Sequence, residues 1–293
     1  MRFNDWLYFL IVLTSLCWLS ACGSSTTNPD TPNAGSGAAQ LTLEPAPLTS
    51  TRGWAPASHA SYSLQLTGTP NLAATIQVAE IDLFDTPSTT IRQWQQQAVH
   101  VICYFSAGTR ESWRPDSSSF SAAVIGLADS GWSGENWVDI RSAQVRQIML
   151  ARLDLAASKG CDGVDPDNVN GYTNATGFPL TAQDQLDFNV NLANAAHSRG
   201  LAIALKNDTH QIALLTNYVD FAINEQCQET SECPLYQPLL QAGKLVVDVE
   251  YNSSYLQNLQ GVFTQLCQQN QALGIETLIL PPTLNGSYRY ACP

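Results

Sequence analysis

The chain has 293 residues, 44% of them hydrophobic and only 13% charged, and a formal net charge of −12. This composition is sufficient for one large buried core. The acidic balance argues against nucleic acid or an anionic membrane surface as the partner and favours a cationic ligand. An acidic surface kept for solubility would have the same composition.

The N-terminus has the pattern of a targeting segment. The apolar stretch from Trp6 to Leu19 is shorter than the roughly 18 residues that a spanning helix needs. The next residues, 19–23, read Leu-Ser-Ala-Cys-Gly and resemble the lipobox of bacterial lipoproteins. We therefore expect residues 1–21 to be a signal peptide and Cys22 to be lipidated. The protein would then be exported and anchored through this lipid in a bacterial membrane, at the outer membrane or the cell surface. A plain secreted protein is the alternative.

Residues 22–50 are rich in Ser, Thr, Asn, Pro, Gly and Ala, with few large apolar groups. Such a composition cannot repay its ordering entropy, so we predict a flexible tether. The pattern changes near Trp54 and stays uniform to the end. We predict one domain at 51–293, close to the usual size of a (β/α)8 barrel.

Short, often β-branched runs predict buried parallel strands in this domain. The runs are Ser61–Leu66, Gln77–Phe84, His100–Phe105, Cys161–Asp165, Leu201–Lys206, Asp220–Glu225, Lys244–Glu250 and Glu276–Leu280. Helical patterns lie between several of them, at Ser142–Ser158, Thr181–Ser198 and Tyr255–Leu273, each followed by Gly within two residues. Repeated βα units with eight strands predict an α/β fold, a single closed (β/α)8 TIM barrel. The alternative is an open doubly wound sheet, which would use GxGxxG or P-loop glycines, and neither motif is present.

Six cysteines follow the N-terminal segment, and an even number in an exported chain indicates disulfides. Cys227 and Cys233 flank a short loop and are the best candidates for a pair. Cys267 with Cys292 would hold the C-terminal tail, which leaves Cys103 with Cys161. Zinc is the competing interpretation, but no CxxC, HxH or HExxH spacing occurs. We expect no metal and no cofactor.

Nearly every predicted strand ends in a polar side chain, and a parallel barrel gathers its strand ends around one mouth. Asp167 follows the fourth strand beside Asn168, and Glu225 ends the sixth. Two carboxylates there could flank one glycosidic bond. A single acid at a strand end can also cap the next helix. Helix capping explains the whole set of strand-end polar residues less well than a shared active site does. A serine hydrolase is disfavoured because no GxSxG elbow occurs, and we assign the sequence around Ser133 to a loop.

The chain resembles the endo-α-1,4-polygalactosaminidases, glycoside hydrolase family 114, over nearly all of residues 54–290. The motifs that carry the resemblance are Ile81-Asp82-Leu83-Phe84-Asp85, Ile102-Cys103-Tyr104-Phe105-Ser106, Trp113-Arg114-Pro115-Asp116, Gly160 to Asn168, Leu205-Lys206-Asn207-Asp208, Asn224-Glu225-Gln226-Cys227 and Val249-Glu250-Tyr251. The family implies a (β/α)8 barrel that cuts galactosamine polymers with an Asp after strand four and a Glu at strand six. These positions correspond to Asp167 and Glu225.

The resemblance implies a glycoside hydrolase that cuts a cationic galactosamine polysaccharide by endo cleavage. We expect it to act as a monomer and without a cofactor. Our hypothesis is retention, with Asp167 as nucleophile and Glu225 as acid/base, and with Asp165 as the second candidate for the nucleophile. The residues expected to bind substrate are Asp82, Asp85, Tyr104, Asp165, Asn168, Lys206, Glu250 and Tyr251. The alternative function is a surface-anchored carbohydrate-binding protein without turnover.

Overall fold

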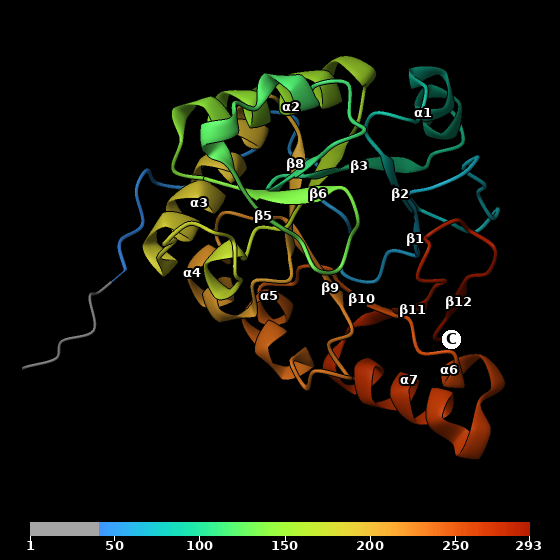
Figure 1. Ribbon diagram of the computed structural model, residues 1–293. Coiled ribbons are helices and arrows are strands. Elements are labelled where there is room, and N and C mark those ends of the chain that lie inside the picture. Colours follow the sequence, from blue (N-terminus) through green and yellow to red (C-terminus); the bar gives the residue numbers. More distant parts are fainter. Residues whose placement is uncertain (1–40) are drawn as a thin grey trace, which may run out of the picture. The chain divides into compact units, whose positions relative to one another are not determined.

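Eight parallel strands form the centre of the computed structural model, which describes residues 41–293 (Figure 1). They are hydrogen-bonded in the order β1-β2-β3-β7-β8-β9-β10-β11. Their bounds are β1 Tyr62–Gln65, β2 Val78–Asp82, β3 His100–Ser106, β7 Gly163–Asp167, β8 Ala202–Lys206, β9 Phe221–Glu225, β10 Val246–Glu250 and β11 Glu276–Ile279. A short antiparallel strand, β12 (Tyr290–Ala291), follows β11. All eight predicted strands are present, with ends that differ by at most two residues.

The sheet curls around an apolar interior. One face of the strands supplies a single buried cluster that includes Leu64 of β1, Phe221 of β9 and Leu278 of β11, so the two edge strands share one core. Within residues 41–293, however, β1 and β11 form no strand pair. The chain after β11 spans this seam, because the backbone N–H groups of Leu66 and Thr67 both donate to the Leu284 carbonyl, at 3.0 and 3.1 Å. The predicted TIM-like α/β fold is thus confirmed as a curled parallel sheet, closed by a loop instead of a strand ladder.

Helices cover the outer face of the sheet, with α1 (Ser88–Gln95) against β3, α2 (Ala143–Lys159) against β7, α3 (Ala182–Ser198) against β8 and α7 (Val262–Leu273) against β11. Helix α3 begins with a capping box between Thr181 and Asp184. Helix α2 ends at Gly160, whose φ of 90° suits a residue without a Cβ. Three helices were not predicted: α1, α4 (Ile212–Leu215) and α5 (Gln237–Gln241).

The helix predicted at Tyr255–Leu273 is divided in two. A short helix, α6 (Ser254–Gln257), is separated from α7 by three residues with positive φ, at Asn258, Gln260 and Gly261. The amphipathic pattern continues across this break, so the sequence periodicity did not reveal it.

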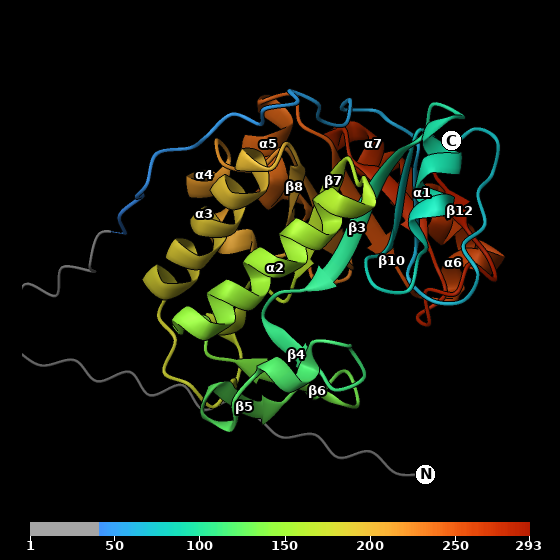
Figure 2. The same ribbon diagram turned by 90° about the horizontal axis from the view of Figure 1, so that it is seen from above.

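A second, small antiparallel sheet was not predicted either. Its strands are β4 (Thr109–Glu111), β5 (Ile125–Ala128) and β6 (Glu135–Val138), in the order β4-β6-β5. The sheet is inserted between β3 and α2, and Figure 2 shows it beyond the C-terminal end of β3. It therefore lies beside the mouth of the curled sheet, where the strand-end side chains meet.

Three disulfides form as predicted, between Cys103 and Cys161, Cys227 and Cys233, and Cys267 and Cys292. The last of these bridges α7 to the C-terminus. Within residues 41–293, none of the helices has the length and apolar character required to cross a membrane.

The predicted tether ends earlier than residue 50. The Leu48 N–H donates to Asn194 Oδ1 at 2.7 Å, and the Asn194 amide donates to the Ala46 carbonyl at 3.0 Å, which binds this segment along α3. Leu41 and Leu43 also pack against the main core. Residues 41–50 thus belong to the folded unit. The predicted signal peptide at 1–21, the lipidation site Cys22 and the rest of the tether lie outside the described residues.

Candidate active site

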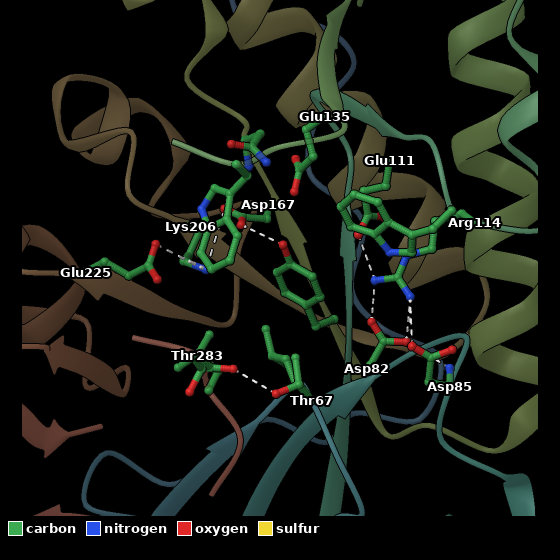
Figure 3. Close-up of a pocket in the computed structure, with 16 residues that line it drawn as sticks. Thr67, Asp82, Asp85, Glu111, Arg114, Glu135, Asp167, Lys206, Glu225 and Thr283 are labelled. Carbon is green, nitrogen blue, oxygen red and sulfur yellow. Dashed lines mark hydrogen bonds and ion pairs between the residues drawn. The ribbon is translucent and has the colours of Figure 1, made fainter. Parts of the chain in front are cut away.

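The ammonium group of Lys206 is the centre of a charged cluster at the C-terminal ends of β7, β8 and β9. Its Nζ lies 3.5 Å from Asp167 Oδ1, 3.8 Å from Glu225 Oε2 and 3.4 Å from Asp165 Oδ2. Side chains alternate along a strand, so residues such as Ile223 and Glu225 lie on the same face and point into the curl. Figure 3 shows Lys206 between Asp167 and Glu225. The two acids singled out in the sequence are therefore brought together.

Asp167 is held from two sides. The Tyr104 hydroxyl donates to Oδ2 at 2.9 Å, and the Asn168 N–H donates to Oδ1 at 2.7 Å. The backbone N–H groups of Ala107 and Gly108 donate to the Asp167 carbonyl. A Cβ on Gly108 would lie 1.8 Å from the Asn168 carbonyl oxygen, so only glycine permits this approach of the β3 end to the β7 end.

Glu225 is positioned by groups from neighbouring strands. The Tyr251 hydroxyl donates to Glu225 Oε1, and the Glu225 N–H donates to the side-chain oxygen of Asn207 at 3.0 Å. Directly after Glu225, the Cys227–Cys233 disulfide closes a short loop. Such fixed placement suits a catalytic group, because about 1 Å of displacement can cost roughly a hundredfold in rate.

Asp165 lies beneath the pocket and does not line it. It is fully buried beside Glu80, a second buried acid that receives a hydrogen bond from the Tyr62 hydroxyl at 2.8 Å. Burial raises the pKa of Asp165 to about 6, against the lowering effect of Lys206. Burial and the charge of Asp165 raise the pKa of Glu80 well above its usual value, so Glu80 is the protonated member of the pair. Burial alone would lower the pKa of Lys206, but the carboxylates around it outweigh this and raise it.

A second cation, Arg114, neutralises another group of acids at the mouth. Its guanidinium lies 2.5 Å from Asp82 Oδ2, 2.7 Å from Glu111 Oε1 and 3.3 Å from Asp85 Oδ2. Burial would lower the pKa of Arg114, but its hydrogen bonds to Glu111 and Asp82 raise it. Asp82 and Asp85 line the pocket as expected, and Asp82 is thus already paired.

The pocket that contains these groups has a volume of about 710 Å³, including the part open to solvent. Trp113, a candidate for stacking on sugar rings, lines the pocket. Two parts of the wall were not recognised in the sequence as parts of the site. They are Glu111, Arg114, Trp132 and Glu135 from the inserted segment, and Leu66, Thr67, Thr283 and Leu284 at the seam. Trp113 and Trp132 are about half exposed, at 53% and 54%, and form apolar rims. The sequence around Ser133, which had been assigned to a loop, leads directly into Glu135, but no spacing rule marks this acid.

Tyr251 and Glu250, which were both expected to bind substrate, lie on different sides of β10 relative to the pocket. Tyr251 reaches the site through its hydrogen bond to Glu225. Glu250 lies outside the pocket, because adjacent residues of β10 face opposite sides and Val249 belongs to the interior. Its Oε1 accepts a hydrogen bond from the Gln228 N–H at 3.0 Å, and burial with the nearby Asp248 raises its pKa to about 8.

The candidate metal ligands do not form a free site. Within residues 41–293, the group with suitable spacing consists of Cys227, Cys233 and Asp248, and the two sulfur atoms are bonded to each other. No free thiolate is left to bind a metal there.

The geometry of the carboxylate pair fits glycoside hydrolysis. Because Asp167 and Glu225 contact the same Nζ, their nearest oxygens lie no further apart than the sum of 3.5 Å and 3.8 Å. Retaining glycosidases place their carboxyl groups about 5–5.5 Å apart, whereas inverting enzymes use about 6.5–9.5 Å. This upper limit on the oxygen separation is compatible with a retaining pair and also with the short end of the inverting range.

Comparison with known proteins gives one family. The model of glycoside-hydrolase family GH114 matches residues 44–292. The crystal structure of Aspergillus fumigatus Ega3 in complex with galactosamine is similar, with a TM-score of 0.77 and 36% identity over 83% of this chain and 99% of that one. The glycoside hydrolase domain of PelA from Pseudomonas aeruginosa has a TM-score of 0.61 at 13% identity, over 78% of this chain and 96% of that one, which is a likeness of fold. A search of curated proteins found no match.

Proposed function

Since the chain belongs to glycoside hydrolase family GH114, we propose that it hydrolyses α-1,4-linked galactosamine polymers by endo cleavage, with Asp167 as nucleophile and Glu225 as acid/base. The observation that carries this proposal is the pair of carboxylates on separate strands that share the Lys206 ammonium inside one pocket. Asp165 fits the role of nucleophile less well, because it is fully buried beneath that pocket.

The proposed reaction has two steps. Asp167 attacks the anomeric carbon while Glu225 gives its proton to the leaving glycosidic oxygen, and a glycosyl ester forms. Glu225 then takes a proton from water, which attacks the anomeric carbon and releases Asp167. Tyr104 and Asn168 fix the orientation of Asp167 during both steps.

The charge and shape of the pocket support an unacetylated amino sugar as substrate. Ega3 was crystallised with galactosamine, whose ammonium would be attracted to a mouth rich in carboxylates. The half-exposed rings of Trp113 and Trp132 offer faces on which sugar rings and ammonium groups can rest.

Incubation with defined galactosamine oligomers tests this function. We expect shorter oligomers whose newly formed anomeric centre initially keeps the α configuration, as observed by NMR. Asp167→Asn should remove essentially all turnover, whereas Asp165→Asn should lower the melting temperature and keep measurable turnover. Oligomer binding without fragments would instead support the alternative of a carbohydrate-binding protein.

We also propose that lipidated Cys22 anchors the enzyme in a bacterial membrane, on the basis of the sequence around this cysteine. Metabolic labelling with a fatty acid should mark the protein, and Cys22→Ser should abolish the label and release the enzyme from the membrane fraction. Equal labelling of the two forms would contradict this proposal.

A further inference from the structure

Glu135, at the start of β6, is one of six carboxylates that line the pocket, and it has no cation beside it in the part of the chain that the structure describes. It is only 6% exposed, and its carboxylate points toward the middle of the pocket (Figure 3). Within residues 41–293, no Lys or Arg nitrogen lies within 4 Å of its oxygens. The two cations of the pocket, Lys206 and Arg114, are paired with other acids. An unpaired buried carboxylate is costly, so its retention needs a reason.

The hydrogen bonds around Glu135 orient donors toward it. The Thr109 hydroxyl donates to Glu135 Oε2 at 2.5 Å, so the Thr109 oxygen must accept from the Ser106 hydroxyl, 2.5 Å away. The Ser106 oxygen accepts in turn from the Asn168 amide at 2.9 Å. This chain of donors joins the residue next to Asp167 to Glu135 and favours the ionised form of Glu135. The hydrogen bond from Thr109 fixes Oε2 of Glu135, and Oε1 is left to face the pocket.

Burial and the charges near Glu135 shift its pKa in the direction opposite to these hydrogen bonds. Burial, the largest effect, raises its pKa to about 7, and the nearby carboxylates of Glu111, Asp167 and Asp129 add to this. The Tyr104 hydroxyl, whose pKa is itself raised, also lies in this environment. A cation that entered the pocket would therefore be strongly attracted, because it would neutralise a carboxylate that the protein leaves without a partner.

We propose that Glu135 binds the ammonium group of an unacetylated galactosamine unit in the pocket and thereby selects the de-N-acetylated form of the polymer. This proposal rests on the proposed function of the same site. The ammonium of a 2-amino sugar supplies three donors, of which one can pair with Oε1 of Glu135. An acetamido group at that position supplies no positive charge, and its extra carbonyl would face a carboxylate. Glu135 thus selects the substrate, while Asp167 and Glu225 cut it.

Binding measurements with two matched oligomers test the role of Glu135. In an Asp167→Asn background, which keeps the ligand intact, dissociation constants are measured for a galactosamine oligomer and for the same oligomer after N-acetylation. We expect Glu135→Gln to weaken binding of the free-amine oligomer about 10- to 100-fold, since this is the strength of a hydrogen bond to a charged group. Binding of the acetylated oligomer should change by less than about threefold.

Asp129→Asn is the matched control, because it removes one negative charge near Glu135, directly after β5, at a residue that does not line the pocket. It should change neither constant by more than about threefold. If the melting temperature of Glu135→Gln lies far below that of the parent, Glu135→Asp is used in its place. The ratio of the dissociation constants for the acetylated and the free-amine oligomers should then lie between the ratio of the parent and a ratio of one. Equal weakening for both oligomers, or no weakening for either, overturns the proposal. Cleavage by the wild-type enzyme is assayed separately, so a failure of the proposed function is distinguishable from a failure of this selectivity.

Discussion

Replacement of Lys206 by Met should destabilise the protein strongly and in a pH-dependent way. Its Nζ lies within 3.4–3.8 Å of three carboxylate oxygens, and each contact is worth about 4–5 kcal/mol at an effective dielectric constant of about 20. Desolvation of the lysine offsets much of this attraction, and removal of one member of a buried pair usually costs about 3–5 kcal/mol. For a domain of this size, that cost corresponds to a decrease in melting temperature of roughly 6–20 °C.

The pH dependence follows from Asp165. Its folded-state pKa, about 6, lies above the usual value of 3.8, so its contribution to stability is greatest at low pH and falls as the pH rises toward and past 6. Lys206 lowers this pKa, so Lys206→Met raises it further and extends the loss to higher pH. At pH 5, Asp165 is mostly protonated in both proteins. The melting temperatures of the wild type and of Lys206→Met should therefore differ less at pH 5 than at pH 8.

Thermal unfolding at pH 5 and pH 8, followed by circular dichroism, checks this prediction. Lys244→Met is the control, because Lys244 donates to the backbone carbonyls of Thr216 and Val219, which do not titrate. Its loss in melting temperature should be similar at the two pH values. A Lys206→Met protein that loses less than about 2 °C at pH 8, or loses equally at both values, would refute the reasoning.

Three smaller changes test the positions of the catalytic groups. Tyr104→Phe removes the 2.9 Å hydrogen bond to Asp167 and should lower kcat about 10- to 100-fold with KM within about threefold; an unchanged kcat would contradict it. Gly108→Ala places a Cβ against the Asn168 carbonyl, so we expect kcat to fall at least about a hundredfold and the melting temperature by a few degrees; wild-type kinetics would show that the backbone adapts freely. Replacement of both cysteines in the loop after Glu225 by serine should cost about 2 kcal/mol in chemical denaturation and should lower kcat, whereas full stability would mean that the loop needs no disulfide.

The strands and their chemistry were predictable because local sequence carries both signals. Each of the eight runs is short and apolar, and nearly every one ends in a polar group. Parallel strands bring those ends together regardless of their distance in sequence. Asp167, Lys206 and Glu225 could therefore be placed at one site without knowledge of any contact between them. The three cysteine pairs followed from spacing and elimination.

The direction of each side chain was harder to predict. Residues 247–250 of β10 alternate between valine and an acid, and both valines belong to the interior cluster, so Glu250 points away from the pocket. The prediction used only the position of Glu250 at a strand end and did not apply this alternation. The inserted sheet was missed because its strands have three or four residues and contain Gly, Asn and charged side chains. Glu111 and Glu135 therefore carried no recognisable pattern.

The seam between β1 and β11 is joined by a loop and not by paired strands, which has a consequence for the pocket. Thr283 and Leu284 bridge the two edge strands and also form part of the pocket wall. A few backbone hydrogen bonds and the hydrogen bond from the Thr67 hydroxyl to the Thr283 carbonyl, at 2.7 Å, hold this part of the wall, whereas β7, β8 and β9 are paired with one another in the sheet. Segments with few such bonds open at lower free energy than sheet interiors. Local opening at the seam would therefore cost less free energy than separation of β7, β8 and β9, and it would widen the pocket while Asp167 and Glu225 keep their spacing.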